Sequence, residues 1–154
     1  MSIRALALLV VVVVLASCTA DEPAGDGLSD IGLDGFATTT IRVDGRDLVV
    51  AVAESPNQRS RGLMGVTDLG GLDGMLFVFQ SDADGGFWMK NTLISLDIAF
   101  FDSDGGLVNI LTMEPCTADP CQTYRPGGSY RYAVEAAAGD LDFVVAGSRL
   151  EIAD

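Results

Sequence analysis

After residue 37 the chain alternates between short apolar runs and turn residues. Ile41 and Val43 alternate with polar neighbours, and residues 130–136 repeat this alternation, which is typical of strands with one buried face. Residues 75–79 are wholly apolar and residues 96–101 nearly so, which indicates two further strands. The hydrophobic pattern therefore predicts several short strands.

The residues between these runs predict how the strands are connected. Asp44-Gly45 provides the positive φ angles of a two-residue type I′ turn and predicts a β-hairpin. Ser55-Pro56 has the form of a helix N-cap followed by proline at the first position, so a short helix should run to about Leu63. Since no full-length helices alternate with the strands, we predict a mainly β fold: a compact antiparallel β-sandwich or barrel with one or two short helices.

Composition limits the possible functions. The chain has 154 residues, enough for one domain, and a net charge of −13, which disfavours nucleic acid as a partner. An acidic surface with one lysine suggests the hypothesis of a halophilic source, and an ordinary acidic secreted protein is the alternative. The absence of histidine removes His-based triads and His metal ligands, so no metal or cofactor is predicted.

The N-terminus has the layout of a secretory signal peptide. One early charge, Arg4, precedes an apolar run that is short for a membrane span. The run ends in Leu15-Ala16-Ser17-Cys18, which resembles a lipobox, the motif in which the cysteine is lipidated. This resemblance predicts a signal peptide at 1–17, a flexible acidic, Gly-rich tether at 18–37 and a single β domain at 38–154. It implies an anchor in the membrane through Cys18, at the outer face of the cytoplasmic membrane or in the cell envelope.

Two further cysteines, Cys116 and Cys121, remain after Cys18 is assigned to the lipid. Outside the cytoplasm such a pair indicates a disulfide. The alternatives fit less well, because a redox pair usually has two intervening residues and zinc requires two more ligands.

Residues 85–102 contain the chain's only tryptophan and its only lysine. Lys90 and Asp97 lie among large apolar residues, where a charge costs several kcal/mol unless it is paired. The run at 87–92, followed by Leu96-Asp97-Ile98, resembles the central motif of family 192 of the domains of unknown function. The resemblance extends over about 38–152, implies a compact β fold with one or two short helices, and brings no established activity.

Seven residues in the matched motifs are candidate ligand-binding residues. We expect several of them to converge at one end or face of the sheet, with polar groups beside an aromatic wall to which Phe87 can also contribute: Trp88, Lys90, Asn91, Asp97, Glu114, Tyr124 and Glu135. The alternative is that Lys90 pairs with Asp97 or Glu135 and only ties strands together. Arg59 and Arg61, followed by Gly62-Leu63-Met64, resemble the family's first motif, an Arg-containing helix that ends in Gly-Leu-Met. Each arginine by itself is interpreted as a solvated helix charge.

Three functions are consistent with these observations. The first is a lipid-anchored extracytoplasmic binding or accessory domain for a small ligand, such as a carbohydrate or a cell-envelope component. The second is a carboxylate-based hydrolase, with Asp97 and Glu114 as its acid and base. The third is a structural envelope protein without a small ligand. The absence of histidine and of any catalytic motif favours binding over catalysis.

Overall fold

The computed structural model describes residues 28–152. The predicted signal peptide, Cys18 and the start of the predicted tether lie outside this range. Within it, no helix is long and apolar enough to cross a membrane.

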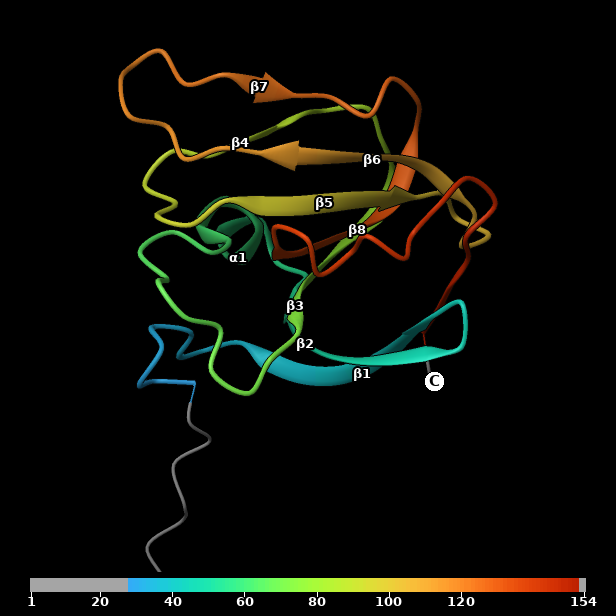
Figure 1. Ribbon diagram of the computed structural model, residues 1–154, viewed down its shortest axis with the longest axis horizontal. Coiled ribbons are helices and arrows are strands. Elements are labelled where there is room, and N and C mark those ends of the chain that lie inside the picture. Colours follow the sequence, from blue (N-terminus) through green and yellow to red (C-terminus); the bar gives the residue numbers. More distant parts are fainter. Residues whose placement is uncertain (1–27, 153–154) are drawn as a thin grey trace, which may run out of the picture.

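Nine strands and one short helix make up the described part of the chain (Figure 1). Seven strands form one curled sheet in the order β6-β5-β8-β3-β2-β1-β9, and β4 pairs with β7 in a small second sheet. The elements are β1 (Ala37–Val43), β2 (Arg46–Ala53), α1 (Pro56–Arg61), β3 (Gly74–Ala83), β4 (Phe87–Trp88), β5 (Leu96–Phe101), β6 (Leu107–Met113), β7 (Thr123–Tyr124), β8 (Tyr130–Ala137) and β9 (Leu150–Ile152). The predicted mainly β fold with a short helix is confirmed.

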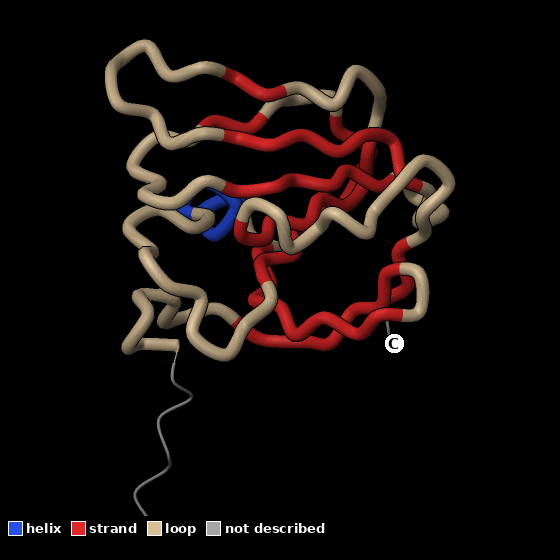
Figure 2. The backbone as a smooth tube through the Cα atoms, viewed as in Figure 1, coloured by secondary structure: helices blue, strands red, loops and turns tan. Residues whose placement is uncertain are grey.

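The sheet curls until its two ends approach each other, so that it forms a half-barrel (Figure 2). Gly106, just before β6, forms an isolated bridge with Arg149, just before β9, and the amide of Leu107 donates to the carbonyl of Ser148 at 3.0 Å. One strand pair departs from the expected antiparallel pattern, because β2 and β3 are parallel. Parallel neighbours require a crossover, and the segment that contains α1 provides it.

Local sequence signals are realised at the turn and at the helix. Asp44 and Gly45 adopt φ angles of 50° and 80° in the β1–β2 hairpin, as predicted. Ser55 caps α1, its hydroxyl accepting from the Gln58 amide while the Gln58 side chain accepts from the Ser55 amide. This reciprocal capping box fixes the start of the helix.

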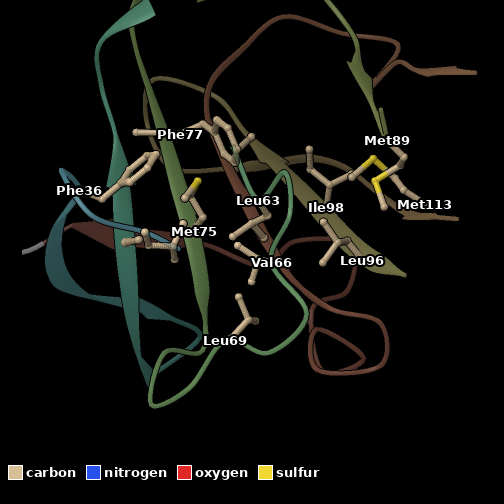
Figure 3. Packing of buried hydrophobic residues seen from close by; sticks show 14 of the residues in the cluster. Phe36, Leu63, Val66, Leu69, Met75, Phe77, Met89, Leu96, Ile98 and Met113 are labelled. Carbon is tan, nitrogen blue, oxygen red and sulfur yellow. The ribbon is translucent and has the colours of Figure 1, made fainter. Parts of the chain in front are cut away.

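Two apolar clusters lie on opposite faces of the large sheet. Along β5, Ile98 and Phe100 belong to the first cluster and Ala99 and Phe101 to the second, because successive side chains point to opposite faces. Figure 3 shows part of the first cluster, in which Leu63 from the segment after α1 packs with residues of the sheet. The candidate groove described below lies on the side of this first cluster.

The domain begins earlier than the sequence predicted. Leu28, Leu33 and Phe36 were assigned to the flexible tether, but their side chains are at most 6% exposed and pack in the first cluster. These three apolar residues are spaced among glycines and aspartates, so no periodic pattern identified them. The part of the tether at 28–36 is therefore packed against the domain.

The predicted disulfide is confirmed. Cys116 and Cys121 are joined with an S–S distance of 2.06 Å in the loop between β6 and β7.

Candidate functional site

Strand β4 forms an aromatic wall with one buried and one open side. The Phe87 ring packs into the core, with its centroid 5.0 Å from that of Phe77 and 5.6 Å from that of Phe100. Trp88, the next residue, points the other way and is 52% exposed. The two rings point in opposite directions because the backbone of β4 is extended. Strand β4 pairs with β7, and Gly86, the residue before β4, lies close to Thr123 of β7.

A groove runs between this wall and helix α1. Its outer chamber has a volume of about 280 Å³ and is lined by Arg59, Phe79, Trp88 and Tyr130, among others. A smaller chamber of about 30 Å³, the inner chamber, is lined by Gly62, Thr92 and the buried Glu135, among others. Arg59, Ser60, Phe87 and Trp88 line both chambers, so the two form one continuous site.

Arg59 is held in this groove by main-chain acceptors. Its Nη1 donates to the carbonyls of Glu54 and Val78, the latter at 3.0 Å, and its guanidinium lies 4.8 Å from the centroid of the Phe79 ring. The interpretation of Arg59 as a solvated helix charge is therefore wrong. Arg61 is tied down in a similar way, donating to the carbonyls of Gly32 and Asp34.

Glu135 forms the inner end of the groove. The residue is 5% exposed, and within residues 28–152 its carboxyl has no hydrogen-bond partner and no ion pair. Within residues 28–152, every side-chain nitrogen or oxygen that is fully buried has a hydrogen-bond partner. The carboxyl oxygens of Glu135 have none, so they must be accessible from the cavity that the residue lines. Burial raises the pKa of Glu135 to about 8, because removing the ionised form from water is costly.

Lys90 lies beside the groove and pairs with a residue that the sequence did not suggest. Its Nζ is 3.3 Å from Oδ1 of Asp119 in the disulfide loop and 5.8 Å from the centroid of the Trp88 ring. Lys90 therefore does not form the pair with Asp97 or Glu135 that was the alternative expected from the sequence. Asp119 is far from Lys90 in the sequence, so no local pattern indicates that the disulfide loop lies beside Lys90.

Glu114, Tyr124 and Asn91 do not line either chamber. Glu114 is exposed and accepts from the Ser95 hydroxyl at 2.6 Å, while its amide donates to the Tyr124 hydroxyl at 3.1 Å. Asn91 adopts a left-handed φ of 57°, and its carbonyl accepts from the Gly65 amide at 2.8 Å. These contacts connect loops around β4 and β7.

Asp97 lies on the other face of the large sheet from Glu135. In the register of β5 and β8, Asp97 is opposite Ala136 and Ile98 is opposite Glu135, so Asp97 shares its face with the second apolar cluster. Its Oδ1 accepts from the Thr112 hydroxyl and its Oδ2 from the Gly139 amide, both at 2.7 Å. Asp97 is thus a buried connector of β5, β6 and the turn after β8, away from the groove.

The structure therefore brings together two of the seven candidates, Trp88 and Glu135, in one groove. Lys90 lies at its edge, and Arg59, Ser60 and Thr92 are lining residues that sequence reasoning did not select. A signal for Arg59 was present, since it belongs to the Arg-containing helix of the family's first motif and precedes Gly62-Leu63-Met64.

One group of metal-binding residue types lies close together in the described range. Single ligand atoms of Cys116, Asp119 and Cys121 are within 4.8 Å of one another. The two cysteine sulfurs are bonded to each other, and a disulfide does not provide the thiolates that soft metals require. These residues therefore do not fit a metal in the oxidised protein.

Comparisons with known proteins give a family and a fold. The model of DUF192, described as uncharacterized ACR, matches residues 39–152. The chain is similar to a crystal structure from Sinorhizobium meliloti, provisionally described as a transcription regulator, with a TM-score of 0.67 and 33% identity over 76% of this chain and 95% of that one. It is also similar to a protein of unknown function from Novosphingobium aromaticivorans, with a TM-score of 0.67 and 25% identity over 78% of this chain and 89% of that one.

No curated protein matches the chain. The family match spans all the strands from β2 to β9 and most of β1, together with the groove. This chain belongs to the DUF192 family.

Proposed function

We propose that this protein is a lipid-anchored, extracytoplasmic binding or accessory domain, and that its ligand is a small neutral polyhydroxylated molecule of the carbohydrate class. The observation that carries this proposal is the groove beside Trp88. An exposed indole, a fixed guanidinium and a buried carboxyl line one concave site, which is the usual design of a small-ligand pocket.

Size and charge favour a small neutral ligand. The outer chamber of about 280 Å³ is just below the range for ligand pockets, roughly 300–1,000 Å³, so it fits only a small ligand. The net charge of −13 repels polyanions, so the description of the Sinorhizobium relative does not lead us to propose DNA binding for this chain. A sugar ring can pack its apolar face on Trp88 and present hydroxyls to Arg59.

The alternative of a carboxylate hydrolase is less well supported. Such an enzyme requires a second carboxyl opposite the acid. Glu135 is the one carboxylate among the described residues that line the groove, and Asp97 lies on the opposite face of the sheet. A structural role is also less well supported, because the buried Glu135 has no partner within residues 28–152.

The anchoring part of the proposal depends on Cys18, through its resemblance to a lipidated cysteine. Labelling of cells with a radioactive fatty acid or isoprenoid precursor tests it. We expect label on the native protein and none on Cys18→Ser. Equal labelling of the two would contradict the anchor.

The binding part can be tested with the full-length protein in detergent. Because Trp88 is the single tryptophan, its fluorescence reports directly on ligands in the groove. We expect a monosaccharide or disaccharide from a panel of neutral sugars to change this fluorescence saturably and to raise the melting temperature. Trp88→Ala should abolish the thermal shift, whereas Val49→Ala, at an exposed apolar residue on β2, should retain it. A panel without any saturable change would contradict the proposal.

A further inference from the structure

The inner chamber contains a polar group whose hydrogen-bonding capacity is unused. Glu135 lies on the interior strand β8, between β5 and β3, and its neighbours in register are Met75 and Ile98. A carboxyl buried in such apolar surroundings normally has a partner, since leaving it unpaired costs free energy. No residue within 28–152 provides one. The missing partner must therefore come from what occupies the chamber.

The dimensions of the chamber restrict that partner to a small group. Its volume of about 30 Å³ exceeds the roughly 10–15 Å³ that one water molecule requires, and it shares Trp88 with the outer chamber. A single hydroxymethyl-sized group can therefore enter while the rest of the ligand stays outside.

The charges around the chamber disfavour ionic groups. Arg59 and Arg61, the charged residues that line it from α1, repel an ammonium group. A carboxylate or phosphate would be attracted by these guanidinium groups and could accept from a protonated Glu135, but its oxygens cannot donate to the acid C=O and the overall charge of −13 opposes its approach. At neutral pH the Glu135 carboxyl, with its pKa raised to about 8 by burial, is mostly protonated. A hydroxyl matches it, because a hydroxyl can accept from the acid O–H and donate to the acid C=O.

We infer that the inner chamber is a subsite for the primary hydroxyl of a neutral sugar or polyol, anchored by Glu135 while the ring of the ligand lies in the outer chamber against Trp88. This inference rests on the proposed function and specifies which atom of the ligand is recognised. Arg59 lines both chambers, and its Nε and Nη2, which have no hydrogen-bond partner within residues 28–152, can donate to a ring hydroxyl.

A titration with matched ligands tests the inference on the full-length protein. The probes are D-glucose, D-galactose and D-mannose, each compared with its 6-deoxy analogue and, for the hexose that binds most tightly, with its 6-amino analogue. Binding is measured by Trp88 fluorescence and by saturation-transfer NMR. We expect the 6-deoxy analogue to bind at least 10-fold more weakly, because it leaves the buried carboxyl unpaired.

Variants at Glu135 separate recognition from folding. Glu135→Leu removes the polar group at similar volume, so it should weaken hexose binding at least 10-fold while leaving the 6-deoxy analogue almost unaffected. Glu135→Gln keeps a donor and an acceptor and should retain most of the affinity. Glu114→Gln changes an exposed carboxylate outside the groove and serves as the control that should behave like the native protein.

The possible failures are distinguishable. Equal affinity for a hexose and its 6-deoxy analogue, or tighter binding of the 6-amino analogue, would overturn the hydroxyl subsite but leave sugar binding in the groove. If none of the hexoses binds, both the subsite and the proposed carbohydrate ligand are overturned.

Discussion

Trp88 and Glu135 line the same chamber although they belong to different sheets, Trp88 to the pair β4–β7 and Glu135 to strand β8 of the half-barrel. The site therefore forms where the small sheet covers the large one beside α1. A change in the packing of either sheet should alter the groove, since each contributes one wall.

Burial of Glu135 should make stability depend on pH. Its pKa is raised from 4.5 to about 8, so the folded state retains a proton that the unfolded state loses. The stabilising contribution is complete below about pH 4.5 and is lost as the pH rises to about 8, by up to about 1.4 kcal/mol per pH unit. We expect Glu135→Gln to remove this part of the pH dependence, and to be more stable than the native protein above pH 8. Urea unfolding of both proteins at several pH values measures the difference, and parallel pH profiles would contradict the prediction.

Asp97 should contribute to stability but not to ligand binding. Asp97→Ala removes the acceptor of two part-buried hydrogen bonds, from the Gly139 amide and the Thr112 hydroxyl, which should reduce the free energy of unfolding by about 1–3 kcal/mol. Asp97→Asn should cost less, because its amide oxygen can still accept from Gly139 while the Thr112 hydroxyl rotates to accept from its NH₂. Denaturant unfolding measures both variants. If a folded Asp97→Asn protein no longer shows the sugar-induced change in Trp88 fluorescence, Asp97 contributes to ligand binding as well as to stability.

The ion pair of Lys90 with Asp119 should contribute little. Both side chains are substantially exposed, 40% and 72%, and exposed pairs are typically worth less than about 1 kcal/mol. Lys90→Met should therefore change the free energy of unfolding by less than this amount. A double-mutant cycle with Asp119→Asn checks it, and a coupling energy well above 1 kcal/mol would indicate that the pair is shielded from solvent.

The disulfide should stabilise the domain modestly. Its loop, from Cys116 to Cys121, is short, and chain entropy gives about 2 kcal/mol for closing it. Replacing both cysteines by serine should lower stability by about this amount and release the loop that positions Asp119 near Lys90. Comparison of the native and Cys116→Ser/Cys121→Ser proteins in urea tests this, with the reduced native protein as a second reference.

The halophilic hypothesis predicts a dependence of stability on salt. If the charge of −13 is adapted to high salt, the melting temperature should fall steeply as NaCl is reduced, because repulsion between carboxylates is no longer screened. Thermal unfolding from 0.1 to 3 M NaCl measures it. A melting temperature that is constant across the series would favour an ordinary acidic protein.

The sequence by itself determined the strands, the turn and the helix cap, because these depend on neighbouring residues. Alternation around Ile41 defined a half-buried strand, Asp44-Gly45 provided the positive φ angles of the hairpin, and Ser55-Pro56 began α1. The pairing of Cys116 with Cys121 could also be predicted, because few cysteines and a short separation left little choice.

Only the tertiary structure decided which polar residues meet. Glu135 and Asp97 both occupy buried strands, and the register of β5 with β8 places them on opposite faces. Sequence patterns do not specify that register, because it depends on how the whole sheet curls and pairs. The same holds for Arg59, whose exposure on a six-residue helix was the reasonable expectation until β3 supplied the carbonyl of Val78 and the ring of Phe79. Contacts between residues far apart in the chain, rather than local preference, made the groove.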